Sequence, residues 1–500
     1  MMNHAVRAYW RHLRMRRLGL WLALVFVGSG IIYSVGLGRG FTVDEYTTWQ
    51  ATRLPLPELI ANRLRAGHSP VYFVFESWWV RVFGDAEWVM RVPSVLFAAG
   101  SVVLLFLFLR SLLGNSVANY ALPLLLTHQL AVTCAHSARP YAGALFFSIA
   151  LGFTLSQWWR DGKLRMLFYL FATTLLGLLF YPAFGLSVAA MAVACLTAIP
   201  CNKRKATWGL LTLLLAVLVL AVPTLLLAKS QQRFSLQGFS WSFERPINLL
   251  ARTVFGDYKL VFRGATRYLV LVVWGWLLFR AFWTLRSSVM FRSIASDFPI
   301  SRFLTSWVFV PPLALNLFEA VTHRNVLSHP RYLLPSLGGI IVLHAVAFAS
   351  CQIQPQAKRD GWNKWLRLMP FLMVTFQLIV TLGWLRTNGD GPHELAPQLL
   401  RINARAPVIG MTHPLSYEWR NLEHRPPLIP AYQLSVEEFQ ELIHKAAPDG
   451  IFWVFVYDNN MNSLDTHVRE NLPRGLQCAQ RLSVEDARAY LITPRSTQID

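Results

Sequence analysis

Acidic residues are scarce in this chain of 500 residues: Asp and Glu number 26, against 47 Lys and Arg. Charged residues together make up only 15% of the sequence, whereas hydrophobic residues make up 54%. The core of a water-soluble fold does not need so much apolar surface. The composition therefore excludes an ordinary soluble protein and predicts one that resides in a membrane.

Cysteine is also scarce. The five cysteines, at positions 134, 195, 201, 351 and 478, form no close pair with metal-ligand spacing, so they predict neither a zinc site nor a disulfide framework. A nucleic-acid-binding protein would need a soluble basic face with interleaved aromatic side chains, and the sequence has none. The net charge of +21 instead indicates basic loops between apolar runs, close to anionic lipid headgroups.

Apolar runs long enough to cross a membrane recur along the chain. A membrane-spanning helix needs about 20 apolar residues, and runs of roughly that length begin near residues 18, 92, 117, 140, 166, 183, 207, 266, 303, 332 and 368. The segment Pro70 to Phe83 is shorter and contains Glu76 and Arg81, so we expect an interfacial or re-entrant helix there. The sequence thus predicts an α-helical polytopic protein with about eleven spans.

Basic residues alternate with these apolar runs. The first run is too long for a secretory signal and lacks a cleavage site, so we expect it to remain as a span. Because positive charge marks the cytoplasmic side of membrane helices, the N-terminus is predicted to lie inside. An odd number of spans then places the C-terminus outside the inner (plasma) membrane. The predicted inside loops contain Arg110, Arg160, Lys163, Arg165, Lys203, Arg204, Lys205, Arg280, Arg286, Arg292, Arg302, Lys358, Arg359, Lys364 and Arg367.

Polar residues concentrate on the predicted outside. The outside segments comprise residues 39–91, 136–140, a break at Tyr181 and Pro182, residues 229–267 and residues 319–331, all within a transmembrane domain of residues 1–386. Residues 387–500 have the composition of a soluble protein, and we expect a small outside α/β domain there. In this domain the run Gly450 to Tyr457 predicts a buried strand. Ser435 and Glu438 have the spacing of a capping box, which predicts a helix through Lys445.

Two adjacent carboxylates, Asp44 and Glu45, follow the first span within the segment Gly40 to Tyr46. Carboxylates held at a membrane surface can act as a general base or bind a divalent cation. The simpler interpretation is a solvated loop acid or a helix N-cap. The sequence contains no full set of metal ligands, so it does not decide whether the protein binds a divalent metal cofactor. Asp44 and Glu45 are the candidate ligands.

His68 lies in the same loop, just before the short apolar segment. A histidine there can bind phosphate or shuttle a proton. The alternative is a residue at the start of a helix, because Ser69 followed by Pro70 is typical of an N-cap and a first helical position.

Two arginines lie where predicted spans meet the outer surface: Arg139, close to Tyr141, and Arg331, next to Tyr332. A guanidinium group at this depth can bind a phosphate through two parallel hydrogen bonds. It can equally extend to lipid headgroups without any role in a site.

The order of these motifs resembles that of a known superfamily. Between Phe41 and Pro335 the chain carries, in this order, an acidic motif, a His-x-Pro element, Phe-Gly followed by Arg-x-Pro-Ser, Ala-Arg-x-Tyr and Arg-Tyr-Leu-Leu-Pro. This pattern resembles the GT-C glycosyltransferases, and in particular the protein O-mannosyltransferase and aminoarabinose-transferase families (glycosyltransferase family 39). The resemblance implies a GT-C helical bundle, a polyprenyl-phosphate sugar donor and inversion of the anomeric centre.

By this resemblance Asp44 occupies the position of the catalytic carboxylate, with Glu45 beside it, and His68 matches the histidine of a His-Pro-Pro element. Aminoarabinose transferases carry there a lysine that meets the donor phosphate, and this chain has no such lysine. We therefore assign phosphate binding to Arg331, with Arg139 as the second candidate. The expected substrate-binding residues are His68, Arg139, Tyr141, Arg331 and Tyr332.

The sequence thus predicts an inverting glycosyltransferase that moves a hexose or pentose from a polyprenyl-phosphate carrier to a lipid, glycan or protein acceptor on the outer face of the membrane. The expected partners are the donor and membrane lipids. A glycan polymerase or ligase of the same fold is an open alternative. A lipid-carrier flippase or transporter is another, but transporters place ionisable groups near the bilayer midplane and often contain repeats. The predicted spans are almost free of ionised residues and lack a repeat.

Overall fold

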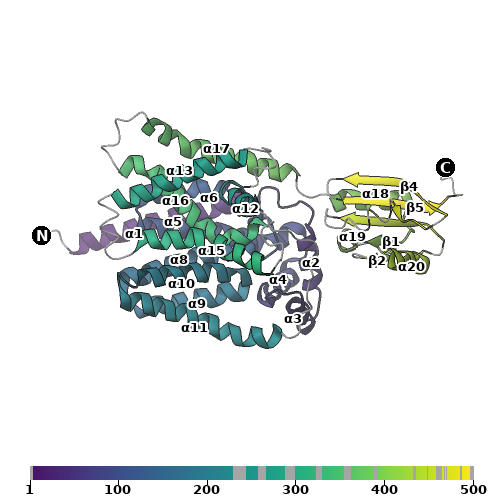
Figure 1. The fold of residues 1–500 in the computed structure, drawn as a ribbon, viewed down its shortest axis with the longest axis horizontal. Coiled ribbons are helices and arrows are strands. Elements are labelled where there is room, and N and C mark those ends of the chain that lie inside the picture. The colour runs from purple at the N-terminus through teal and green to yellow at the C-terminus, as the bar shows by residue number, and fades with distance from the viewer. Residues whose placement is uncertain are drawn as a thin grey trace. The chain divides into compact units, whose positions relative to one another are not determined.

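The computed structural model describes residues 4–228, 244–256, 266–287, 299–322, 329–353, 362–387 and most of 391–495 (Figure 1). Most of the expected outside loop 229–267, and residues 323–328 of another, lie outside the described residues. The chain divides into two compact units. The first comprises residues 1–35, 55–79 and 90–386, and the second comprises residues 36–54, 80–89 and 387–500. Two stretches of the loop 39–91, which is predicted to lie outside, thus fold with the C-terminal part of the chain.

The first unit is a bundle of apolar helices (Figure 1). Each apolar run expected from the sequence forms a helix, which in the case of α6 and α7 is interrupted at His128. The expected polytopic helical fold is confirmed. The helices are α1 (His4–Ser34), α5 (Glu87–Leu112), α6 (Asn115–Thr127), α7 (Gln129–Ala135), α8 (Tyr141–Asp161), α9 (Leu164–Phe180), α10 (Gly185–Ala198), α11 (Lys203–Ala228), α13 (Thr266–Ser287), α15 (Ile300–Thr322), α16 (Leu334–Ile353) and α17 (Trp362–Thr387).

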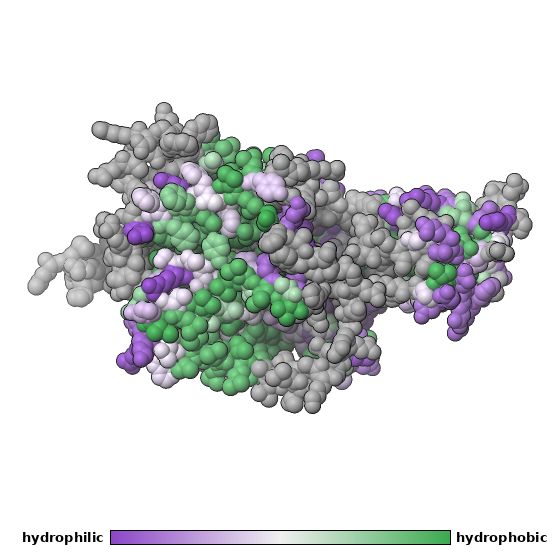
Figure 2. All heavy atoms as spheres, viewed as in Figure 1, coloured by the Kyte–Doolittle hydropathy of each residue, from purple (hydrophilic) through white to green (hydrophobic). Residues whose placement is uncertain are grey.

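The surface of this bundle is suited to lipid. Among the described residues, five helices are long and apolar enough to cross a membrane, and two further apolar helices are shorter. Large apolar side chains such as Leu24, Leu164, Val272 and Phe371 are exposed, and Figure 2 shows a broad hydrophobic surface on the bundle. Such a surface is unfavourable in water but not in a bilayer.

Helix α16 forms the core of the bundle. Its apolar segment is entirely buried, and it packs against α6, α8, α13 and α15. Gly338 permits a close approach to α15, because a Cβ at this position would lie 2.7 Å from the Trp307 ring. The indole N–H of Trp307 in turn donates to the Pro335 carbonyl at 2.7 Å. Packing and a buried hydrogen bond thus fix α16 against α15.

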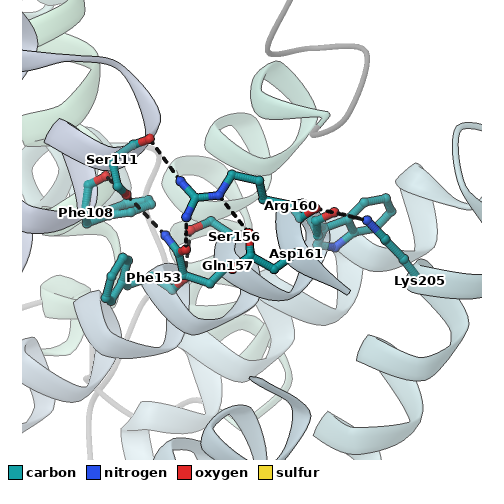
Figure 3. Close-up of polar contacts among 9 residues, drawn as sticks. Phe108, Ser111, Phe153, Ser156, Gln157, Arg160, Asp161 and Lys205 are labelled. Atoms are coloured by element: carbon teal, nitrogen blue, oxygen red, sulfur yellow. Dashed lines mark hydrogen bonds and ion pairs between the residues drawn. The ribbon is translucent and has the colours of Figure 1, made fainter. Parts of the chain in front are cut away.

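Basic side chains join the ends of α5, α8 and α11 (Figure 3). Arg160 donates to the Ser111 carbonyl at 3.2 Å, and the Gln157 amide donates to the Ser111 hydroxyl at 3.2 Å. Lys205 donates to the carbonyls of Trp159 and Arg160 at the end of α8. Cations at a helix C-terminus satisfy carbonyls that have no partner within the helix. Basic residues that predict the topology therefore also cap helices.

Short helices occupy the predicted outside segments. These are α3 (Leu56–Arg65), α4 (Pro70–Phe83), α12 (Glu244–Phe255), and the 3₁₀ turns η1 (Pro182–Phe184) and η3 (Pro330–Leu333). Helix α4 has the bounds expected for the short apolar segment. The Ser69 hydroxyl before it donates to the Leu179 carbonyl near the end of α9. The start of α4 is therefore tied to the neighbouring break between α9 and α10.

The second unit contains a small five-stranded sheet with the order β2-β1-β3-β5-β4. Strand β1 is parallel to β2 and β3, whereas β5 is antiparallel to β3 and β4. The expected C-terminal α/β domain is confirmed. Its elements are α2 (Val43–Thr52), α18 (Gly391–Asn403), β1 (Val408–Gly410), α19 (His413–Glu418), β2 (Leu428–Pro430), α20 (Val436–Ala446), β3 (Phe452–Tyr457), β4 (Leu476–Val484) and β5 (Ala487–Pro494).

Two local predictions in this unit are confirmed. Strand β3 is buried at every position, as expected for the run Gly450 to Tyr457. At the start of α20 the Ser435 N–H donates to the Glu438 carboxylate at 2.8 Å, and the Glu438 N–H donates to the Ser435 hydroxyl at 3.2 Å. This is the capping box that the sequence predicts, and it satisfies two backbone donors at the helix start.

Candidate functional site

The two candidate phosphate-binding arginines lie at the starts of two helices of the first unit. Arg139 belongs to the turn between α7 and α8, and Arg331 belongs to η3, directly before α16. The Arg139 N–H donates to the Ser137 carbonyl at 2.7 Å, and the Ser94 hydroxyl donates to the same carbonyl at 2.6 Å. These bonds fix the turn and hold Arg139 in a buried position.

Both guanidinium groups face one ring, that of Tyr141. The Cζ of Arg331 lies 5.3 Å from the ring centroid, and the Cζ of Arg139 lies 5.8 Å from it. Arg331 also lies 5.9 Å from the centroid of Tyr332, and Tyr181 packs edge-on against Tyr141 with centroids 5.6 Å apart. Four of the expected substrate-binding residues are thus brought together.

A second ring, Phe73 of α4, extends this arrangement. Its centroid lies 5.5 Å from the Cζ of Arg139 and 5.0 Å from the Cζ of Arg63 in α3. The His68 ring packs on Phe73 with centroids 5.8 Å apart, so His68 shares a packing partner with Arg139. Burial, together with the nearby charge of Arg139, lowers the pKa of Arg63 to about 10. We define the arginine–aromatic cluster as Arg63, Phe73, Arg139, Tyr141, Tyr181, Arg331 and Tyr332.

Sequence reasoning missed three members of the cluster: Arg63, Phe73 and Tyr181. Arg63 lies near a second arginine, Arg65, which is exposed. One signal was available, because the helical period places Arg63 on the same face of α3 as Leu59, and both are buried. No local pattern marks Phe73 or Tyr181, since their contacts are with residues far away in the sequence.

The cluster gathers positive charge where little water can reach it. Guanidinium groups stack on aromatic rings and bind phosphate oxygens through paired N–H donors. The lowered pKa of Arg63 is caused first by burial and then by the nearby charge of Arg139, because like charges that are close together repel. A bound anion would relieve this repulsion, so the chemistry of the cluster suits a phosphate group.

The acidic motif of the first loop lies in the second unit, at the start of α2. Glu45 closes a capping box: its Oε2 accepts from the Thr42 N–H at 2.9 Å and from the Thr42 hydroxyl at 3.0 Å. The Glu45 side chain is fully buried. Asp44 is only half-buried, and its backbone carbonyl accepts from the hydroxyls of Thr47 and Thr48. Glu45 thus stabilises the helix, whereas Asp44 is the more accessible carboxylate.

Asp85 ties α2 to other segments of the second unit. Its Oδ2 accepts from the Trp49 indole at 2.9 Å and from Arg53 at 2.8 Å, and Arg420, after α19, lies 3.9 Å from its Oδ1. Burial acts to raise the pKa of Asp85, but the hydrogen bonds from Trp49 and Arg53 and the nearby charges outweigh it and lower the pKa. The carboxylate therefore stays charged and connects α2 with the segment after α19.

Glu418, the last residue of α19, is a second anchor of α2. The Tyr46 hydroxyl donates to its Oε1 at 3.1 Å, and the His393 Nδ1 lies 2.9 Å from its Oε2. Burial raises the pKa of Glu418. Within the described residues, Glu418, His393 and Glu87 form a group whose potential ligand atoms all lie within 4.8 Å of one another. Sequence reasoning did not single out these residues, and neither carboxylate of the acidic motif belongs to the group.

The comparison with known families agrees with the motifs. Residues 67–226 match the family model of the dolichyl-phosphate-mannose-protein mannosyltransferases. Together with the helical bundle and the small sheet unit, this match confirms the resemblance to the GT-C superfamily. No curated protein matches the sequence.

Superposition on solved structures identifies the fold. ArnT from Cupriavidus metallidurans, in the apo state, superimposes with a TM-score of 0.61 at 13% identity, covering 95% of this chain and 98% of ArnT. ArnT bound to undecaprenyl phosphate gives a TM-score of 0.57 at 14% identity with the same coverage. The archaeal oligosaccharyltransferase AglB from Archaeoglobus fulgidus, in complex with an inhibitory peptide and a dolichol-phosphate, gives 0.51 at 11% identity, covering 90% of this chain and 70% of AglB. The chain therefore has the GT-C fold.

Replacing Asp85 with Asn should destabilise the second unit. Asp85→Asn removes the charge that pairs with Arg53, and we expect a loss of about 1.5 kcal/mol, at the low end for hydrogen bonds to charged groups because Arg53 is partly exposed. The folded-state pKa of Asp85 is lowered, so its stabilising contribution is present above the ordinary carboxyl pKa and is lost as the pH falls through the lowered value. Thermal unfolding followed by intrinsic fluorescence between pH 7 and pH 3 measures both effects.

The matched control is Asp161→Asn. Asp161 is similarly exposed, but it pairs with its sequence neighbour Arg160 at 3.1 Å, and a local surface pair contributes little. If Asp85→Asn melts at the wild-type temperature at pH 7, Asp85 does not hold α2 in place.

Proposed function

We propose that this protein transfers a sugar from a polyprenyl-phosphate carrier to an acceptor hydroxyl on the outer face of the membrane, with inversion of the anomeric centre. The observation that carries the proposal is the stacking of Arg139 and Arg331 on the ring of Tyr141. Such a pair can hold a phosphate between two planar donor groups.

The donor class is supported by the related structures. ArnT was solved with undecaprenyl phosphate, and AglB was solved with a dolichol-phosphate. Both ligands join a phosphate to a long prenyl chain. Such a chain partitions into lipid at about 0.8 kcal/mol per buried CH₂, so its headgroup is presented at the membrane surface, where the arginine–aromatic cluster would meet it.

The two ends of α8 support the outer location. Arg139 and Tyr141 lie at its start, whereas Arg160 lies near its end and caps α5. A helix of 21 residues is about 30 Å long, the thickness of the hydrocarbon core. Basic residues favour the inside for the end of α8, which supports an outside location for the cluster at its start.

In the proposed reaction, the acceptor oxygen attacks the anomeric carbon from the side opposite the phosphate. The bond between this carbon and the phosphate oxygen breaks, and the phosphate leaves with additional negative charge. Arg331 and Arg139 stabilise that charge. Asp44 accepts the proton of the acceptor hydroxyl as general base, while Glu45 keeps α2 capped.

Arg331 is predicted to bind the donor phosphate through both arms of its guanidinium group. Arg331→Ala should weaken the binding of undecaprenyl phosphate by about 1.5–3 kcal/mol, the range for a hydrogen bond to a charged group. Arg331→Lys keeps the charge but loses the planar fork, so it should stay impaired. Binding can be measured by microscale thermophoresis on the purified protein in detergent.

The control for this series is Arg165→Ala, because Arg165 is exposed at the start of α9. Its affinity for undecaprenyl phosphate should equal that of the wild type. Unchanged affinity and turnover in Arg331→Ala would instead make Arg331 a headgroup anchor and would remove the basis of the proposal.

Asp44 is predicted to be the general base. Asp44→Asn has nearly the same size but cannot accept the proton, so turnover should fall by about 10²- to 10⁴-fold while donor binding is retained. Glu45→Gln is the matched control, since Gln also completes a capping box, and its turnover should fall much less. Sugar transfer from a radiolabelled donor measures the difference; near-normal turnover in Asp44→Asn excludes the base role.

A further inference from the structure

A three-residue group in the second unit is not used by the proposed reaction. Glu87 is the first residue of α5, His393 lies in the first turn of α18, and Glu418 ends α19. Their potential ligand atoms lie within 4.8 Å of one another. Three segments far apart in the sequence therefore converge on one point with two carboxylates and one imidazole.

The Glu418 carboxylate is held in place by its surroundings. Its side chain is only 8% exposed, and its two oxygens face different groups: the Tyr46 hydroxyl at 3.1 Å and the His393 Nδ1 at 2.9 Å. Two carboxylates in such an environment repel each other unless a proton or a cation compensates.

The neighbouring arginines are engaged elsewhere. Arg53 lies 2.8 Å from the Asp85 carboxylate. Arg420 stacks on the Tyr417 ring at 3.7 Å from its centroid and also lies close to Asp85. Asp85 thus has two guanidinium groups beside it, whereas Glu87 and Glu418 converge on the imidazole of His393. Two carboxylates and one imidazole therefore meet at this group.

We infer that Glu87, His393 and Glu418 bind a divalent transition-metal ion, with zinc as the best match. Two carboxylate oxygens and one imidazole nitrogen are typical zinc ligands, and a fourth position is open to water. Ligand atoms around a tetrahedral zinc ion lie about 3.3 Å apart, given bonds of about 2 Å. The ligand atoms of this group lie within 4.8 Å of one another, so small side-chain rotations would bring them to the zinc-binding distance. His393 is 60% exposed, which gives the ion a route from solvent.

Tyr46 supplies the support that such a site needs. Its hydroxyl donates to the Glu418 Oε1 at 3.1 Å. A hydrogen bond of this kind, made by a residue that does not itself bind the metal, fixes the orientation of the metal ligand. Because Tyr46 belongs to α2, which also carries Asp44, the metal would fix α2 against α18 and α19. Only this link to Asp44 rests on the proposed function; metal binding does not.

The test is zinc binding by the full chain, purified in detergent, stripped with chelator and titrated with zinc chloride by isothermal titration calorimetry. Neither donor nor acceptor is present, so the result is independent of catalysis. We expect one zinc ion per chain, with affinity at least tenfold lower in His393→Ala and in Glu418→Gln. Tyr46→Phe should bind more weakly by about tenfold, the lower value for loss of a group that orients a ligand.

Three results would overturn the inference. They are no saturable zinc binding by the wild type, unchanged affinity in His393→Ala, and calcium binding as tight as zinc binding, which would mean an oxygen-only site. The control is His424→Ala, because His424 is an exposed histidine of the same unit, and it should bind zinc like the wild type. His393→Ala should fold, since the His393 side chain is exposed, and circular dichroism of each variant verifies this.

Discussion

Two arginines, Arg139 and Arg331, lie against the ring of Tyr141, and the proposed donor site depends on this contact. A guanidinium group away from water is tolerated when an aromatic face and hydrogen-bond acceptors surround it. The chain provides the ring from α8 and brings the second arginine to it through η3. Arg63 and Phe73 add a further cation and a further ring. On the proposed function, this cluster would meet the negative charge of a lipid-linked phosphate.

The second constraint is the way the loop between α1 and α5 folds with the C-terminal part of the chain. The Tyr46 hydroxyl donates to Glu418, 372 positions later, and the Tyr457 hydroxyl donates to the Phe41 carbonyl. The rings of Phe41 and Tyr417 pack with centroids 4.7 Å apart. Residues 387–500 thus hold α2 in place. On the proposed function, they also position Asp44.

The sequence predicted the features that depend on local patterns. Apolar runs gave each helix of the bundle, and the spacing of Ser435 and Glu438 gave a capping box. The same spacing occurs at Thr42 and Glu45, so the capping role of Glu45 could have been predicted in the same way. Contacts between distant segments could not. The helical spacing from Leu59 marks Arg63 as buried, but its contact with the Phe73 ring from a different helix required the structure.

The residues of the candidate site divide in the same way: those that belong to local motifs were predictable, and those defined by contacts between distant segments were not. The arginines at positions 139 and 331 stood out because each lies in a motif at the start of a span. Glu418 and His393 did not, since nothing near them in the sequence indicates that Glu87 lies beside them. Motif order predicted the superfamily, whereas the contacts among the motifs required the structure.

The central claim is that the donor is consumed and not merely bound. The most direct test incubates the purified protein with a panel of radiolabelled polyprenyl-phosphate sugars and a membrane extract as the source of acceptors. The account predicts that at least one donor is converted, releasing polyprenyl phosphate and an equal amount of sugar on an acceptor. Saturable binding of the donors with complete recovery of intact donor would contradict it, and would make the protein a lipid carrier or transporter.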